Sequence, residues 1–165
     1  MKTLIIYSTK HGTTEKAANI LKSKLIGEVH TVNIMQEPVT SIEDYDTIIL
    51  GGSIYIGKIQ KKLSSFININ LPLLLEKKIG LFICAGEEDE VLKEKEFVLA
   101  FPPALFDHAI GKEVFGFEFD MNKLSFFEKL IMGKVKGIKT SINKLSEEKI
   151  YAFAEIMVRD NGVHK

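Results

Sequence analysis

Residues 4–15 read LIIYSTKHGTTE, an apolar run followed at once by a turn that is rich in hydroxyl side chains. The run Leu4–Tyr7 does not alternate apolar with polar residues, which is typical of a strand buried on both faces. The residues that follow predict a helix over 14–25, because their apolar positions fall on one stripe. A short buried strand that passes directly into a helix is the building unit of a parallel α/β sheet.

The same alternation of strand and helix recurs along the rest of the chain. Further strands are predicted at residues 29–34, 47–50, 79–84 and 114–119, and further helices at 59–69, 88–100, 124–135 and 147–158. This order predicts an α/β fold, a doubly wound five-stranded parallel sheet with helices on both faces. A single domain over residues 1–165 is expected, and that length is enough for a substantial core.

The composition narrows the class of protein. Lys plus Arg and Asp plus Glu number 22 each, so no overall positive field argues for binding to nucleic acid. Cys84 is the only cysteine, which excludes an internal disulfide framework and a cysteine-based zinc site. The histidines share no spacing with carboxylates, so no metal site is expected. Without a signal-like start or an apolar run of about 18 residues, a cytoplasmic location is expected.

The turn at residues 8–14, here called the first loop, has the features of a phosphate cradle. Gly12 permits a backbone conformation that turns N–H groups inward, and Thr13 or Thr14 can cap the helix that follows. A helix N-terminus adds unpaired N–H donors and partial positive charge. The candidate binding residues are Ser8, Thr9, Lys10, His11, Gly12, Thr13 and Thr14. The alternative is an ordinary capped turn with spare threonines. Walker A and G-x-G-x-x-G patterns are both missing.

Two other strands end in segments that belong to the same predicted edge. In open α/β sheets, ligands bind outside the carboxyl ends of the strands, where the winding direction switches. The second loop supplies Gly52, Ser53, Ile54, Tyr55, Ile56 and Gly57, and the third loop supplies Cys84, Ala85, Gly86 and Glu87. Glycines 51 and 52 are expected to turn the chain sharply at the strand end. Exposed apolar side chains in the second loop favour a flat ligand that covers them.

These motifs resemble a known family. The sequence STKHGTTE resembles the phosphate loop of flavodoxins, which bind FMN. Residues 51–57, GGSIYIG, are similar to the G-A-S-I-x-Y-G of the menaquinone-dependent protoporphyrinogen oxidase group, although Ile56 stands where that group has Tyr. Residues 126–132, FFEKLIM, resemble its aromatic-basic-L-I-M stretch. The resemblance implies a flavodoxin-like sheet of order 2-1-3-4-5.

The resemblance also implies a reaction, the oxidation of protoporphyrinogen IX in haem biosynthesis with electrons passed to a quinone. In that interpretation FMN carries the chemistry and no side chain is assigned as catalytic. Two alternatives stay open. One is an electron-carrying flavodoxin that serves a partner redox protein, and the other is a flavodoxin-fold interaction module without redox activity. Electron-carrying flavodoxins are usually acidic, so the zero net charge favours an enzyme or a role near a membrane.

Residues 123–139 form a basic, apolar segment. They contain five lysines against one acidic residue, Glu128, together with bulky apolar side chains. Such a helix can lie on an anionic membrane surface or bind a partner. The segment Lys123–Lys139 is therefore a candidate for peripheral contact with the inner face of the membrane. The alternative is an ordinary packing helix whose lysines are solvated.

Overall fold

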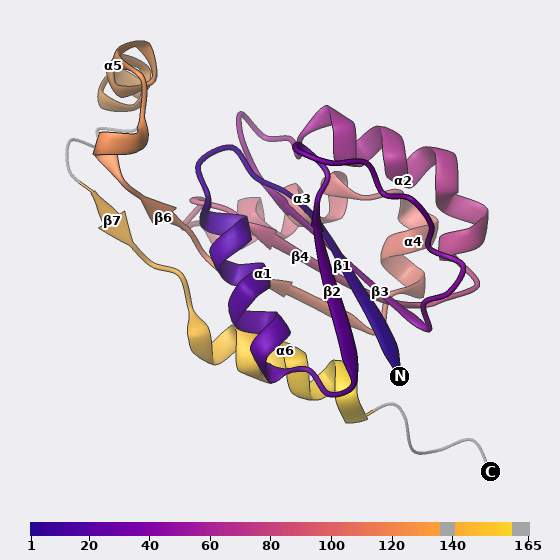
Figure 1. Ribbon diagram of the computed structural model, residues 1–165. Coiled ribbons are helices and arrows are strands. Elements are labelled where there is room, and N and C mark those ends of the chain that lie inside the picture. Colours follow the sequence, from indigo (N-terminus) through magenta and orange to yellow (C-terminus); the bar gives the residue numbers. More distant parts are fainter. Residues whose placement is uncertain (136–140, 160–165) are drawn as a thin grey trace.

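The computed structural model describes residues 1–135 and 141–159 of the chain. At its centre lies a parallel sheet in the order β2-β1-β3-β4-β5 (Figure 1), which confirms the predicted topology. The strands are β1 (Lys2–Ser8), β2 (Glu28–Asn33), β3 (Thr47–Ser53), β4 (Lys78–Cys84) and β5 (Gly111–Val114). Because β1 has β2 on one side and β3 on the other, the winding direction switches beside β1.

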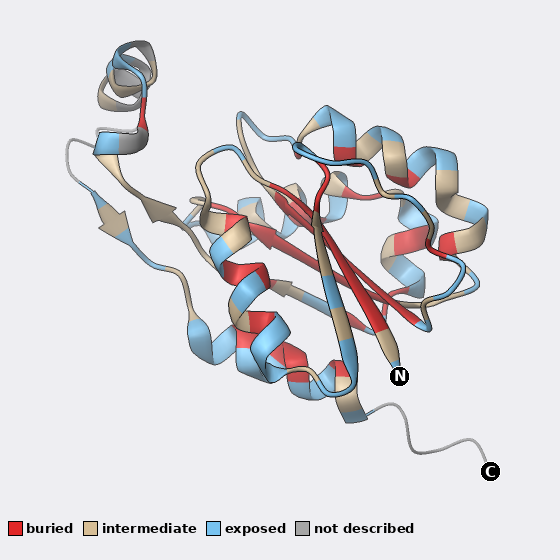
Figure 2. Ribbon diagram, viewed as in Figure 1, coloured by how far each residue is buried: buried red, intermediate tan, exposed pale blue. Residues whose placement is uncertain are grey.

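Helices cover both faces of the sheet, and strands β1, β3 and β4 are buried between them, whereas the edge strand β2 is largely intermediate or exposed (Figure 2). Alternate residues of a strand face opposite sides, so Leu4 and Ile6 join one hydrophobic core while Ile5 and Tyr7 join the other. The first core receives α2 (Lys61–Leu74), α3 (Glu90–Ala100) and α4 (Pro103–His108). The second receives α1 (Thr13–Lys24) and α6 (Glu147–Arg159).

The fifth strand differs from the prediction of 114–119. Strand β5 ends at Val114, and Gly116 then takes a left-handed conformation with φ of 90° that turns the chain out of the sheet. Strand β6 (Glu118–Phe119) instead pairs antiparallel with β7 (Ile142–Asn143). A Cβ at position 116 would lie 2.2 Å from the Lys144 carbonyl oxygen, so the bend needs glycine.

The chain from 115 to 146, here called the excursion, extends between β5 and α6. Besides β6 and β7 it contains a short 3-10 helix, η1 (Met121–Lys123), and α5 (Phe126–Val135). Figure 1 shows α5 standing away from the main sheet, on the side where β6 and β7 leave it. The predicted basic segment 123–139 lies within the excursion, and its residues 136–139 fall outside the described residues.

Two other predictions change in detail. The predicted helix 59–69 begins at Lys61 and runs to Leu74, so Pro72 stands inside α2. Glycines 51 and 52 do not form a turn, because both lie within β3. In the described part of the chain, no helix is long and apolar enough to cross a membrane.

Candidate functional site

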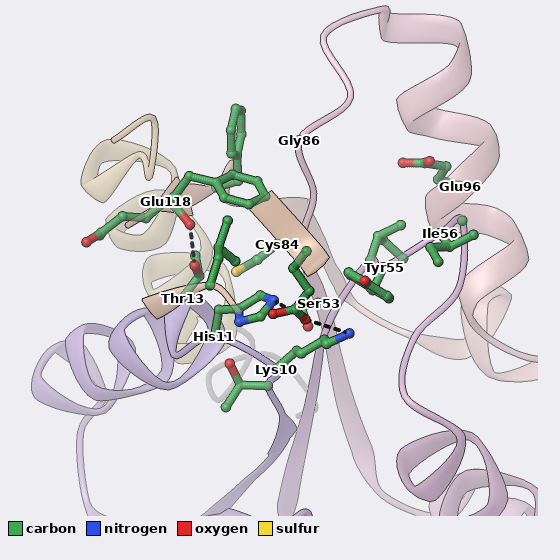
Figure 3. A pocket seen from close by; sticks show the side chains of 17 residues that line it. Lys10, His11, Thr13, Ser53, Tyr55, Ile56, Cys84, Gly86, Glu96 and Glu118 are labelled. Carbon is green, nitrogen blue, oxygen red and sulfur yellow. Dashed lines mark hydrogen bonds and ion pairs between the residues drawn. The ribbon is translucent and has the colours of Figure 1, made fainter. Parts of the chain in front are cut away.

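A cavity of about 340 Å³ lies at the carboxyl edge of the sheet, where the loops after β1, β3 and β4 meet (Figure 3). The predicted site residues that line the cavity are Thr9, Lys10, His11, Thr13, Ser53, Ile54, Tyr55, Ile56, Gly57, Cys84 and Gly86. Its lining does not include Ser8, Gly12, Thr14, Gly52, Ala85 or Glu87. The structure thus brings all three predicted loops together around one cavity, although some residues of each loop do not line it.

The first loop enters α1 through Gly12, the N-cap residue, whose φ is 93°. The Gly12 N–H donates to Thr9 Oγ1 at 2.9 Å. No side chain caps the helix, so the predicted capping by Thr13 or Thr14 is wrong. The Thr13 hydroxyl donates instead to the Glu118 carbonyl at 2.9 Å, and Thr14 is fully buried. The first turn of α1 therefore keeps N–H groups without a side-chain acceptor, as an anion site requires.

Polar side chains join the first loop to the second beneath the cavity. The buried Ser8 donates from Oγ to Gln60 Oε1 at 2.7 Å. Gln60 in turn donates from Nε2 to Ser53 Oγ at 2.8 Å. Ser8 thus fixes the distance between the two loops, and its hydroxyl is already engaged.

A cationic rim borders the first loop. Lys10 Nζ lies 3.1 Å from Glu128 Oε1 and 3.4 Å from the centroid of the Tyr55 ring, a cation–π contact. The His11 ring stands edge-on to Tyr55, with centroids 6.3 Å apart, and its Nε2 lies 3.5 Å from the same Glu128 oxygen. Figure 3 shows Lys10, His11 and Tyr55 gathered on one side of the cavity. Three segments far apart in sequence therefore meet at this rim.

Burial sets the protonation of His11. Desolvation lowers the pKa of His11 below its ordinary value of 6.5, and Lys10 lowers it further, while the Glu128 carboxylate acts in the opposite direction. The ring is therefore neutral at neutral pH, and its contact with Glu128 is then no ion pair.

From this pKa we predict a pH dependence of stability. As the pH falls through 6.5, His11 takes up a proton in the unfolded chain before it does so in the folded one. Its contribution to the free energy of unfolding is therefore fully present above that pH and is lost as the pH falls. Urea unfolding across this range should show a steeper loss for the wild type than for His11→Asn. Equal slopes for the two proteins would contradict the prediction.

The second loop is built around a tight turn. Tyr55 and Lys58 pair across it, with N–H groups donating to each other's carbonyls at 2.9 and 3.3 Å. Both central residues have positive φ, 51° for Ile56 and 72° for Gly57. Positive φ is unusual for a β-branched side chain, and that of Ile56 is 82% exposed. The turn thus carries backbone strain at the mouth of the cavity.

Replacing this strained isoleucine should stabilise the protein. Ile56→Gly is expected to raise the free energy of unfolding by about 1 kcal/mol, because glycine adopts positive φ without steric cost. The mirror control is Gly57→Ala, which introduces a Cβ into open space at positive φ and should lower stability by about 1 kcal/mol. Urea denaturation measures both, and a destabilised Ile56→Gly would show that the side chain packs usefully.

The third loop forms the floor of the cavity. Burial raises the pKa of the Cys84 thiol to about 12, so it stays protonated and acts as a small apolar group. The Ala85 N–H is already bound to the Gly116 carbonyl at 3.0 Å. Glu87 accepts a hydrogen bond from the Asp89 N–H, and Asp89 caps α3, so this acidic run begins a helix. Gly86 faces the Phe117 ring.

Sequence reasoning missed the wall that the excursion contributes. From the excursion the cavity is lined by Phe117, Glu118, Phe119, Leu124 and Glu128, and helix α3 adds Glu96. One local signal was present, because the spacing of Ser125 and Glu128 is that of a capping box that begins α5. Nothing in the sequence near Glu128 indicates its contact with Lys10, because the two residues are separated by most of the length of the chain. Among the described residues, no three metal-ligating side chains cluster.

Comparisons with known proteins agree with the observed fold. An uncharacterised protein of Methanocaldococcus jannaschii is 35% identical over 87 residues, 52% of this chain and 55% of that protein, so the match spans about half of each. Oxidised flavodoxin 1 from Bacillus cereus has a similar fold, with a TM-score of 0.59, 17% identity and coverage of 99% of this chain and 100% of that one. A Fusobacterium nucleatum flavodoxin bound to flavin mononucleotide gives 0.51 and 18%, covering 94% of this chain and 96% of that one. The model of the flavodoxin domain family matches residues 4–158, and the chain therefore belongs to the flavodoxin domain family.

Proposed function

We propose that this protein binds FMN in the cavity and transfers electrons between the flavin and a redox partner. The observation that carries the proposal is the convergence of the first, second and third loops around one hollow beside the switch point of the sheet. Membership of the flavodoxin domain family supports the choice of flavin, and a solved flavodoxin with this fold is bound to FMN.

The first loop fits the phosphate group of FMN. A Cβ built on Gly12 meets nothing within 4 Å, so there is space beside the uncapped first turn of α1. Backbone N–H groups and the positive end of the α1 dipole point to this space. Thr9 and Lys10 of the same loop line the cavity, and the Thr9 hydroxyl accepts a hydrogen bond from the Gly12 N–H. We infer that the phosphate is held mainly by amides and hydroxyls, with Lys10 as the nearest cation.

Apolar side chains around the same cavity fit a flat ring. Ile54 and Tyr55 of the second loop line it, and so does Phe117, which lies against Gly86 of the third loop. Aromatic and aliphatic surfaces of this kind pack well on a planar ring system. Bound FMN supplies one- and two-electron redox chemistry, and the protein's residues bind it, orient it and exclude water from its faces.

Two measurements on the purified protein test the proposal. Its visible absorbance should show flavin bands, or the colourless protein should bind added FMN in titration calorimetry with one site per chain. A bound flavin should then be reduced by dithionite and reoxidised by an external acceptor. Protein that stays colourless and ignores FMN would instead favour the interaction module without redox activity.

The more specific reaction, oxidation of protoporphyrinogen IX with a quinone as acceptor, is supported by the resemblance of residues 51–57 and 126–132 to that enzyme group. The FMN-loaded protein should oxidise protoporphyrinogen anaerobically when menadione is added, and porphyrin fluorescence measures the product. FMN binding without this activity would favour the electron carrier.

Helix α5 supports a further part of the proposal, contact with an anionic membrane. Phe126 and Leu130 on this helix are 83% and 45% exposed, so α5, which also contains lysines, presents bulky apolar side chains to the surroundings. Sedimentation with anionic vesicles at low salt should carry the protein down, and Phe126→Ser should weaken the binding. Equal recovery of both proteins in the supernatant would remove the membrane contact and leave the FMN site unaffected.

A further inference from the structure

Helix α5 brings one carboxylate, that of Glu128, to the rim of the first loop. Its Oε1 lies 3.1 Å from Lys10 Nζ and 3.5 Å from His11 Nε2. Its Oε2 accepts a hydrogen bond from the Ser125 N–H at 3.0 Å, while the Glu128 N–H donates to Ser125 Oγ. One carboxylate oxygen therefore takes part in the capping box at the start of α5, and the other faces Lys10 and His11 of the first loop.

This carboxylate is charged and partly shielded from water. The hydrogen bond from the Ser125 backbone, followed by the contact with Lys10, lowers the pKa of Glu128 to about 2. Its side chain is 18% exposed, against 37% for that of Lys10. The Lys10 ammonium is in turn shared between Glu128 and the Tyr55 ring. Lys10 is thus already neutralised by an anion from within the same chain.

We propose that Glu128 is a specificity-determining residue that weakens the preference of this site for phosphorylated over unphosphorylated flavins. The inference rests on the proposed function, because it concerns how the first loop selects the phosphate of FMN. That phosphate carries close to two negative charges at neutral pH. The phosphate competes with Glu128 for the Lys10 ammonium. The phosphate and the Glu128 carboxylate are both anions, so they also repel each other at short range. Riboflavin has no phosphate and leaves the Lys10–Glu128 contact intact.

The test is the ratio of dissociation constants, riboflavin over FMN, in the wild type and in Glu128→Gln. The glutamine amide oxygen can still accept from the Ser125 N–H, so the start of α5 is preserved. Calorimetry or flavin-fluorescence titration at low salt should show FMN bound about tenfold more tightly by the variant, with riboflavin unchanged. In a Lys10→Met background, Glu128→Gln should change the ratio less, because the ammonium that both anions need is gone.

A matched control separates this effect from a loosening of the excursion. Glu88→Gln removes an ion pair with Lys144, which also ties the excursion to the body of the protein, and it should leave the ratio unchanged. The inference would be overturned if the riboflavin-to-FMN ratio of dissociation constants in Glu128→Gln equalled that of the wild type or fell below it. It would also be overturned if the variant bound riboflavin more tightly by the same factor as FMN. If the wild type binds neither flavin, the proposed function fails instead, so the two failures are distinguishable.

Discussion

Gly12→Asp is expected to bind FMN about a hundredfold more weakly than Gly12→Asn, a difference of about 2.7 kcal/mol. Position 12 has φ of 93°, which Asn and Asp tolerate better than other residues with a Cβ, and the space beside its Cα is open. Both side chains can cap α1, so both variants carry the same backbone strain and the same competition for N–H groups. They differ only in a negative charge placed where the phosphate is proposed to bind.

The size of this effect follows from electrostatics. Two unit charges about 4 Å apart interact with about 4 kcal/mol when the effective dielectric constant is about 20. A hundredfold loss therefore needs only part of the repulsion from a phosphate dianion. The measurement is FMN titration of both variants beside a urea unfolding curve for each. Because aspartate is favourable at a helix N-terminus, the Asp variant should be at least as stable as the Asn variant. Equal FMN affinities would place the phosphate elsewhere.

Gly51→Ala is expected to lower the free energy of unfolding by about 3 kcal/mol, the upper end of the range for overpacking. A Cβ at this position would lie 2.0 Å from Cζ of the Phe82 ring. That ring cannot move aside, because it is fully buried, stacked on Phe115 with centroids 4.7 Å apart and in edge contact with Phe153. To accommodate the added methyl group, the whole aromatic cluster would therefore have to shift.

Two variants control the interpretation. Gly52→Ala, the next residue of β3, should cost less, because its Cβ would meet Ile59 Cγ2 at 2.8 Å, the end of a branched side chain. The double variant Gly51→Ala with Phe82→Leu should recover part of the loss, since leucine leaves room for the methyl group. Urea unfolding monitored by circular dichroism measures all of them. No loss in Gly51→Ala would show that Phe82 can be repacked at little cost.

Most of the fold could be predicted from the sequence, because its signals are local. The strand Leu4–Tyr7 is apolar on both faces, and this requires helices on both sides of the sheet. A helical stripe lies in three of the four intervals between the predicted strands, which favours parallel strands. The strand predicted at 114–119 was wrong in its second half, because the chain leaves the sheet at Gly116. The bend there is fixed by the close packing of Lys144 against Gly116, a contact that the local sequence does not show.

The candidate site divides in the same way. The sequence by itself determined that a hydroxyl-rich turn follows the first strand and opens a helix, because a strand, a glycine and a helix stripe are adjacent there. Only the tertiary structure decided what each side chain of that turn does. Thr13 bonds to Glu118, Ser8 to Gln60, and Lys10 to Glu128. Such contacts join segments separated by about 50 to 120 residues, and their partners are set by packing of the whole chain, which no local pattern records.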